Sequence, residues 1–162
     1  GMALVTMRAA QMVSQGREAR EICSEIERVQ KNVSSYFFMP ASDIFYKNGY
    51  INAITGKLLG KLHLHPKIRA KNAALNICGF QFGDLNSSRR KFVRSILKYN
   101  RVPVNDIVYI THAGLSVQQQ EQILQEIKKY ANFERIIMQK CCVTNACFSG
   151  LGTIGVAFMN DR

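Results

Sequence analysis

The sequence has no tryptophan, only three prolines and no long apolar run. The longest apolar candidate, 151–159, is much shorter than the roughly 20 residues that a transmembrane helix needs, so we predict no membrane span. The amino-terminal residues also lack the basic and apolar blocks of a secretory signal, and we therefore expect a cytoplasmic protein. Apolar residues nevertheless make up 47% of the 162 residues, which excludes a disordered chain and predicts a globular core.

Motifs for metal binding by cysteine and for redox chemistry are also absent. The chain has five cysteines, an odd number, and no pair of them shows C-x-x-C spacing. This excludes zinc knuckles and thioredoxin-type sites. We expect reduced thiols, with Cys78, Cys141 and Cys142 buried in strands as small apolar side chains.

Histidine is scarce, with three residues in the chain. His63 and His65 alternate along a predicted strand and would face one way, but a zinc site needs a third ligand that the sequence does not place near them. His112 with Cys141 or Cys147 could form a thiolate–imidazole pair, which any chain with both residue types offers. We predict no metal, no cofactor and no catalytic residue, and an enzyme is the least favoured interpretation.

Acidic residues are few, with 11 against 22 lysines and arginines. The imbalance lies in residues 35–105, which carry twelve basic and two acidic groups. Such an excess attracts a carboxylate, a phosphate, a nucleic acid or an acidic protein without choosing among them. We interpret the basic face of residues 90–98 as a solvated helix surface, because no aromatic side chains interleave with the charges. A protein-interaction module or a nucleic-acid-binding domain that acts through residues 89–98 remains the alternative function.

Hydrophobic periodicity predicts an alternation of helices and strands. The segments with helical spacing are 2–15, 17–32, 51–62, 88–99 and 117–132. The segments typical of strands are 36–39, 64–68, 74–80, 106–113, 135–143 and 153–159. This order predicts an α/β fold, a two-layer domain with a mixed six-stranded sheet and helices, although the pattern does not fix the strand order.

Several boundaries carry specific signals. Ser87 or Ser88 is expected to cap the fourth of these helices, and Ser116 with Gln119 forms a capping box for the fifth. Ser42 is expected to cap a further short helix that runs through Tyr46. The polar stretch 144–152 is predicted to be a loop.

A series of short motifs follows these elements along the chain. They are Ala9-Ala10 and Gly16 in the first helix, the strand Y-F-F-M-P, the turn K-N-G-Y-I-N, Leu58-Leu59-Gly60 at a helix end, the pair Arg89-Arg90, Thr111-His112-Ala113 at a strand end, and the closing S-G-L-G-T-I-G-V-A-F. In this order, from about Leu4 to Met159, they resemble the DegV family of fatty-acid-binding proteins.

The resemblance implies a non-catalytic carrier. Proteins of that family have two α/β domains with one long-chain fatty acid between them, and in some bacteria they present it to a fatty acid kinase. Residues 35–162 resemble the second domain, and residues 1–34 resemble the helices that lead into it. The first domain, which supplies hydroxyl groups to the carboxylate, has no counterpart here, so we expect an incomplete pocket.

The resemblance also implies a ligand site. Where the family typically has K-G-G-R-I-S, the arginine is replaced by Tyr50, and where it has H-T-G-P-G this chain has F-S-G-L-G at 148–152. An apolar helix wall along the acyl chain is retained. The expected lipid-binding residues are Tyr50, Ile54, Leu58, Leu62, Phe148, Ser149, Gly150 and Gly152.

The first helix is apolar around most of its circumference, more than a lone surface helix needs. Loss of a covering domain would leave such a helix without a partner surface. We therefore predict that Leu4, Val5, Met7 and Met12 bury themselves in a second copy of the chain or in a separately encoded partner.

Overall fold

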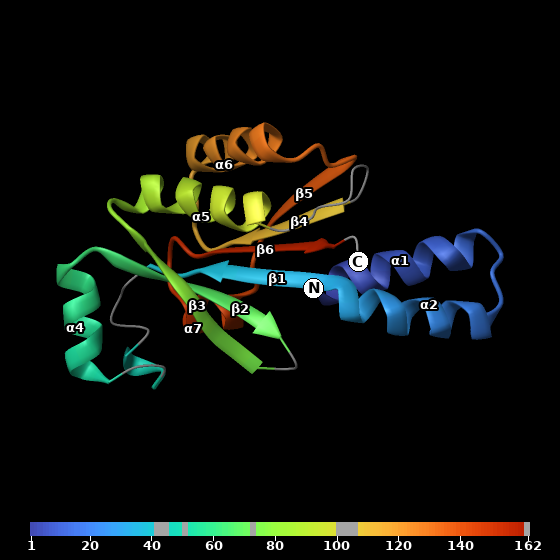
Figure 1. Cartoon of the computed structure of the whole chain (residues 1–162), viewed down its shortest axis with the longest axis horizontal. Helices are drawn as coiled ribbons and strands as arrows, with labels where there is room; N and C mark the ends of the chain where they lie inside the picture. The colour runs from blue at the N-terminus through green and yellow to red at the C-terminus, as the bar shows by residue number, and fades with distance from the viewer. Residues whose placement is uncertain (41–45, 50–51, 72–73, 100–106, 161–162) are drawn as a thin grey trace.

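A mixed six-stranded sheet forms the centre of the molecule (Figure 1). The computed structural model describes residues 1–40, 46–49, 52–71, 74–99 and 107–160. The strands are β1 (Val33–Phe38), β2 (Leu64–Lys71), β3 (Ala74–Phe82), β4 (Ile107–His112), β5 (Arg135–Lys140) and β6 (Ile154–Met159). Their order in the sheet is β3-β2-β1-β6-β4-β5. Neighbouring strands are antiparallel except β4 and β5, which are parallel, so the predicted mixed sheet is confirmed.

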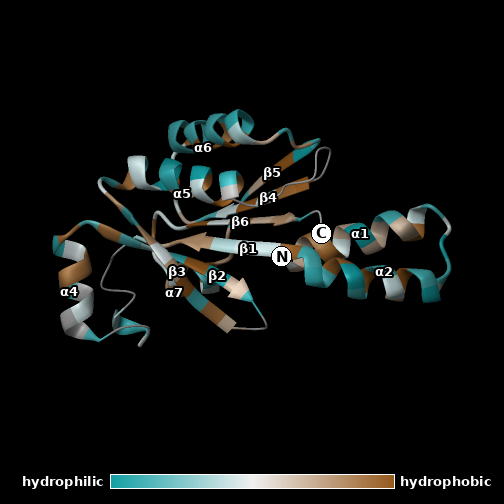
Figure 2. Ribbon diagram, in the orientation of Figure 1, coloured by the Kyte–Doolittle hydropathy of each residue, from teal (hydrophilic) through white to brown (hydrophobic). Residues whose placement is uncertain are grey.

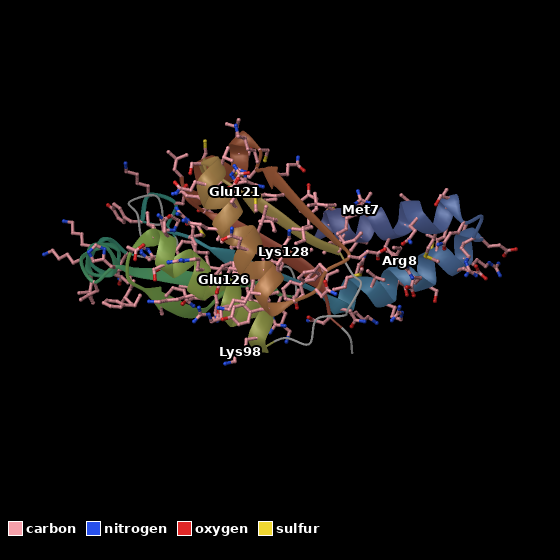
Figure 3. The ribbon with its side chains drawn as sticks, turned by 90° about the horizontal axis from the view of Figure 1, so that it is seen from above. Met7, Arg8, Lys98, Glu121, Glu126 and Lys128 are labelled. Atoms are coloured by element: carbon pink, nitrogen blue, oxygen red, sulfur yellow. The ribbon has the colours of Figure 1, made fainter. Side chains whose placement is uncertain are left out.

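Two of the helices cover one face of this sheet. The helices are α1 (Met2–Ser14), α2 (Ala19–Asn32), α4 (Ala53–Lys61), α5 (Leu85–Tyr99), α6 (Val117–Tyr130) and α7 (Val143–Ser149). Helices α5 and α6 pack side by side over what we call the closed face (Figures 1 and 3), and the charged side chains of α6, such as Glu121 and Lys128, are on the outside. The crossover through α6 is what allows β4 and β5 to run parallel.

The main hydrophobic core lies between the closed face and these two helices. Alternate residues of β1, β4 and β6 point into it, as the period of two in a strand requires. Its buried members are Tyr36, Phe38, Phe92, Val93, Ile96, Leu97, Val108, Ile110, Leu115, Ile123, Ile127, Phe133, Ile154, Val156 and Phe158. The predicted capping box is confirmed, because Ser116 accepts a hydrogen bond from the Gln119 amide while the Gln119 side chain accepts one from the Ser116 amide.

One predicted boundary is wrong, and another is not tested. Helix α5 begins at Leu85, before Ser87 and Ser88, and the side chain of Asp84 accepts the hydrogen bond of the Ser87 amide. Asp84 is as good a cap as serine, so residue preference alone did not separate them. The short helix expected between Ser42 and Tyr46 lies outside the described residues except for Tyr46.

The stretch 144–152, predicted to be a loop, contains helix α7. This helix has only seven residues, too few to show a repeating apolar pattern, and strand β5 ends at Lys140 rather than at 143 to make room for it.

The expectation of buried cysteines fails for two of three residues. Cys78 and Cys142 are exposed, and only Cys141 is partly buried. Cys78 lies on β3, an edge strand whose side chains have no further layer to pack against, and Cys142 is the N-cap of α7 rather than a strand residue. A strand-like sequence therefore does not by itself bury a thiol.

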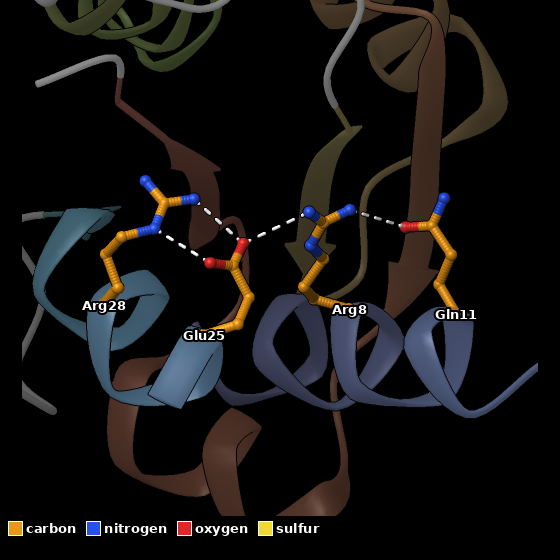
Figure 4. Close-up of polar contacts among 4 residues, drawn as sticks. All are labelled: Arg8, Gln11, Glu25 and Arg28. Carbon is orange, nitrogen blue, oxygen red and sulfur yellow. Dashed lines mark hydrogen bonds and ion pairs between the residues drawn. The ribbon is translucent and has the colours of Figure 1, made fainter. Parts of the chain in front are cut away.

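Helices α1 and α2 form a hairpin that projects from one end of the sheet (Figure 1). Figure 4 shows the polar contacts that join the two helices: Glu25 accepts hydrogen bonds from Arg8 of α1 and from Arg28 of its own helix, at 3.1 Å and 2.8 Å from Oε1. The hydrogen bonds and charges of these two guanidinium groups, that of Arg28 first, lower the pKa of the Glu25 carboxyl to about 2.

The apolar residues of α1 are only partly as predicted. Leu4 and Met12 are buried within this chain, so the prediction that they need a partner is wrong for these two. Contacts of α1 with α2, β4 and β6 provide the burial, which the helix pattern alone did not reveal. Val5 and Met7 are half-buried, and for them the partner surface remains a prediction.

In the part of the chain that the structure describes, no helix combines the length and apolar character needed to cross a bilayer.

Candidate ligand groove

The sheet face opposite α5 and α6, which we call the open face, carries a groove. Its floor is one row of side chains across five neighbouring strands, since the registers pair Ile77 with Ile68, Ile68 with Phe37, Phe37 with Gly155, and Gly155 with Thr111. Paired residues in a sheet point to the same side, so the row forms a continuous strip. Strands β3, β2, β1, β6 and β4 each contribute one member.

Gly155 lies in this strip between Phe37 and Thr111. A Cβ atom at this position would lie 2.7 Å from the Thr111 Oγ1 and 3.0 Å from the ring of Phe37. The absence of a side chain therefore lets Phe37 and Thr111 approach each other across β6. Without this glycine the floor would be blocked between them.

The groove encloses about 550 Å³, within the range of small-molecule sites. Its apolar end is formed by β1, β2 and β3 with the residue after β1, and hydropathy colouring shows the brown apolar segments of β3 there (Figure 2). Its polar end is formed by the ends of β4 and β5, helix α7 and the start of β6. The lining beyond the floor is Met39, Leu75, His112, Ala113, Cys141, Asn145, Phe148, Ser149 and Thr153.

Two hydroxyl groups lie at the polar end, and His112, the last residue of β4, directs its side chain there to the opposite face from Thr111. Thr153 Oγ1 donates to the Ser149 carbonyl at 2.7 Å, which ties the start of β6 to the end of α7. His112 Nδ1 accepts the amide of Leu115 at 3.2 Å, and this bond places the proton of the neutral ring on Nε2. Burial, and then the charge of Lys140, lower the pKa of His112, so the ring is neutral at pH 7 and offers a donor.

The turn between α7 and β6 is held from behind by a buried arginine. Arg89 of α5 is 4% exposed, and its Nε donates to the Gly152 carbonyl at 2.8 Å. The amide of Gly152 donates to the Ala113 carbonyl at 2.7 Å, which joins the turn to the end of β4 as well. Gly152 has a φ of +86°, a conformation that favours glycine.

The structure places six of the eight residues that the resemblance suggested for the site. Phe148 and Ser149 line the groove, and Gly150 and Gly152 shape the turn beside it. Leu58 and Leu62 are 54% and 46% exposed and do not line this groove.

Tyr50 lies outside the described residues, as does the side chain of Ile54 in α4. The turn before α4 does reach the site, because Asn48 Nδ2 donates to the Phe148 carbonyl at 3.1 Å.

The sequence did not point to Phe37, Ile68, Ile77 and Gly155 as site residues. Each lies in a recognisable strand, but their meeting depends on strand order and register. Thr111 was noted only as part of a strand-end motif, and His112 only there and as a possible partner of a cysteine thiolate. A strand containing a lone glycine between branched residues, such as the one at 154–156, was the available signal for a close approach.

Two candidate chemistries do not fit the geometry. His63 precedes β2 in a turn with a φ of +48°, whereas the buried His65 is hydrogen bonded to the Gly83 carbonyl at 3.1 Å. Among the described residues no group of three potential ligands could hold a metal ion. Burial raises the pKa of the Cys141 thiol, which opposes formation of a thiolate beside His112.

The basic helix is less available than its sequence suggests. Arg89 is buried, Lys91 donates to the Phe82 carbonyl at 2.9 Å, and Arg94 pairs with Glu126 at 3.3 Å. Arg94 also lies over the ring of Tyr130, at 5.5 Å. The basic side chains of residues 90–98 are exposed, as expected for a solvated helix surface, whereas Arg89 is buried. Nucleic-acid binding through residues 89–98 remains an untested prediction.

The fold and the groove together define a class of protein. It is an α/β domain whose mixed sheet is covered by helices on one face and carries a groove, apolar at one end and polar at the other, on its other face. The chain belongs to the DegV family, whose model matches residues 1–161.

A curated relative is a DegV domain-containing protein of Clostridium perfringens, 22% identical over 162 residues. The match covers 99% of this chain and 55% of that relative, so the chain spans about half the length of the protein it matches.

Solved structures share the fold at low identity. A DegV family protein from Eubacterium eligens loaded with heptadecanoic acid superposes with a TM-score of 0.81 at 14% identity, over 99% of this chain and 57% of that one. The fatty acid kinase (Fak) B3 protein of Streptococcus pneumoniae, loaded with linoleic acid, gives 0.78 at 15% identity, over 98% and 55%. A fatty-acid-binding DegV family protein from Thermus thermophilus gives 0.78 at 19% identity, over 98% and 56%.

Proposed function

We propose that this chain binds a long-chain fatty acid in the groove of the open face and acts as a carrier without catalysing a reaction. The observation that carries the proposal is the two-ended lining, with Phe37, Ile68 and Ile77 along the floor and Ser149 and Thr153 at the other end. The apolar floor suits an acyl chain, and the polar end suits the carboxylate at the end of that chain. The family relationship and the fatty acids in the structural neighbours support it.

The energetics of such a ligand suit an apolar strip. Each methylene removed from water contributes roughly 0.8 kcal/mol, so even partial coverage of a long chain gives measurable affinity. At the polar end, the hydroxyl groups of Ser149 and Thr153 lie on the lining. In the ligand-free chain they donate to the Asn145 and Ser149 carbonyls, at 2.7 Å each, so a carboxylate would take over these donors. Hydrogen bonds to a charged acceptor are stronger than those between neutral groups, which favours a carboxylate over a neutral head group.

The groove opens to one side, and we propose that a further surface completes it. Leu75 and Ile77 line the groove but are 57% and 47% exposed, which leaves room for a covering chain. That cover is a second copy of this chain or a separate partner that also contacts Val5 and Met7. In this scheme residues 1–34 are the part that meets the partner and residues 35–162 hold the ligand. A fatty acid kinase subunit is the expected recipient of the lipid, by analogy with the kinase system named for the Streptococcus pneumoniae neighbour.

The experiment is native mass spectrometry of protein purified without detergent, with extraction of any released lipid, followed by titration of delipidated protein with an 18-carbon fatty acid. We expect a fatty-acid adduct and saturable binding. Absence of both would contradict the proposal. The same spectra report whether the loaded protein is a monomer or a dimer.

Two substitutions on one strand provide a matched control. Ile77 and Phe80 of β3 are equally exposed, at 47% each, but only Ile77 lines the groove. Ile77→Asp places a charge on the floor and should weaken binding at least about tenfold, whereas Phe80→Asp should leave it within about twofold. Equal effects of the two would mean that the lipid binds elsewhere.

A further inference from the structure

We propose that Arg89 is the positioning residue of the groove's polar end: its buried guanidinium fixes the turn 150–153 and so sets the preference for an anionic head group. The first observation is geometric. Arg89 belongs to α5, on the other side of the sheet from the groove, yet its Nε reaches the Gly152 carbonyl at 2.8 Å. Two segments border this contact, one at Pro40 and one at Gly152. Their neighbours in the chain, Met39 and Thr153, line the groove.

The second observation is the closeness of the fit. A Cβ atom on Gly152 would lie 2.4 Å from Nη2 of Arg89 and 3.3 Å from Cγ of Pro40. The guanidinium is therefore packed directly on the backbone of the turn. Only a residue without a side chain fits there, at a φ of +86° that glycine also tolerates best.

The hydrogen bond determines how the turn presents its amide. In a trans peptide the carbonyl and the N–H point in opposite directions, so a Gly152 carbonyl directed at Arg89 turns the Thr153 N–H away from it. That N–H has only a long bond within the turn, 3.4 Å to the Gly150 carbonyl. Thr153 is a lining residue, so rotation of this peptide would change the polar end directly.

The charge of Arg89 is also unusual. No acidic side chain in the described ranges lies within ion-pair distance of it, although the charge of Asp84 opposes part of the effect of burial, which lowers the Arg89 pKa. Nη1 of Arg89 donates to the neutral Asn86 Oδ1 at 2.9 Å. Asn86 in turn accepts from Gln119 at the start of α6, which holds the arginine in place. A buried cation is costly unless it is compensated. An anionic head group bound beyond the turn would supply that compensation.

The inference rests on the proposed function for its ligand measurements, and an independent measurement needs no ligand. In Arg89→Met the side chain keeps its approximate bulk but loses every donor. We expect the amides of Gly152 and Thr153 in the ligand-free chain to exchange with solvent at least about tenfold faster, because a charge-assisted bond to the turn is removed. Arg90→Met, which changes the exposed neighbour, is the control and should leave these amides unchanged.

Ligand selectivity separates a positioning role from a general structural one. Arg89→Met should weaken binding of an 18-carbon fatty acid about tenfold while changing the affinity for the 18-carbon alcohol by less than about twofold. Arg89→Lys, which retains the charge and a donor, should recover part of the loss. Equal weakening of acid and alcohol would overturn the proposal.

A second variant keeps the test open if Arg89→Met fails to fold. Gly152→Ala pushes against the guanidinium and should reproduce the loss of acid selectivity. Its control is Gly16→Ala, which has a similar φ of +71° but open space within 4 Å of the added Cβ. If the parent chain binds neither lipid, the proposed function fails, and the exchange measurement alone then decides: unchanged exchange at Gly152 and Thr153 overturns the role of Arg89.

Discussion

The two faces of the same sheet are put to different uses. On β1, Tyr36 and Phe38 point into the closed face and are buried, whereas Phe37 between them points to the open face and lines the groove. The closed face is covered by α5 and α6. The open face is covered only in part, by the start of α1 against the Ser35 side chain and by α7 at the polar end of the groove.

This difference separates stability from binding. The closed face accounts for most of the completely buried side chains, so most of the hydrophobic stabilisation arises there. The open face holds apolar side chains that are left partly exposed, and a folded protein retains such a surface at a cost in solubility. Substitutions on the closed face should therefore change mainly the free energy of unfolding, and substitutions on the open face mainly the ligand affinity.

The largest effect is expected from the closed face. Phe92→Ala removes a completely buried ring that packs 5.9 Å from the ring of Phe38, and should lower the free energy of unfolding by about 3–5 kcal/mol. Urea unfolding followed by circular dichroism measures this change. Phe80→Ala, at an exposed site, should stay within about 0.5 kcal/mol. Comparable losses for both would remove the distinction between the faces.

A substitution at the centre of the open face should affect both properties. Gly155→Val places methyl groups against Thr111 and Phe37, so the free energy of unfolding should fall by about 1–3 kcal/mol through overpacking. Fatty-acid binding should be lost because the floor is interrupted. Isothermal titration with an 18-carbon fatty acid, at a temperature where the variant is folded, tests this. Retained affinity would place the ligand off the strip.

A smaller effect is expected at the helix that covers the closed face. Ser116→Ala removes one half of the capping box of α6 and should lower the free energy of unfolding by about 1 kcal/mol. Fatty-acid affinity should not change, since Ser116 does not line the groove. Chemical denaturation and lipid titration of one preparation measure the two quantities. A change in affinity would show that the closed face influences the groove.

The smallest effect is expected from the ion pairs of Glu25 in the hairpin of α1 and α2. The folded pKa of Glu25, about 2, lies below its ordinary value of 4.5, so its ion pairs stabilise the hairpin fully above pH 4.5 and are lost as the pH falls toward 2. The free energy of unfolding, measured between pH 2 and pH 6, should therefore decline more steeply in the parent than in Glu25→Gln. Parallel pH profiles would show that the Arg8–Glu25 contact contributes nothing.

The sequence predicted the helices and strands better than it predicted which of their residues contact one another. The aromatic run Tyr36-Phe37-Phe38 before Pro40 identifies a strand, and all six strands were found, because strand preference is a local property of the sequence. The groove floor depends on which strands are neighbours, and β1 and β6 are far apart in the chain. Local pattern carries no information on that pairing, so Phe37 and Gly155 were not predicted to meet.

Helix α4 shows that an apolar pattern also suggested a contact that the structure does not show. Leu58 and Leu62 have the spacing of an apolar helix face, and the resemblance suggested a wall for the acyl chain. Their exposure shows that an apolar face indicates a need for a partner without identifying it. Phe148 and Ser149, which a motif marked, line the groove, although the helix that carries them was predicted to be a loop. Their contact with a ligand remains a prediction.

The position of β6 has a consequence for how the molecule is made. This strand is the sixth in chain order but lies third from one edge, between β1 and β4. Without β6, β3-β2-β1 and β4-β5 are two separate half-sheets, each with an unpaired edge, and neither carries the whole groove. Pairing of β6 with β1 joins residues more than a hundred positions apart, so the loop-closure entropy makes it a slow step of folding. Until β6 is in place, the apolar residues of the open face are exposed without a complete ligand site, and this partly folded chain is prone to aggregate.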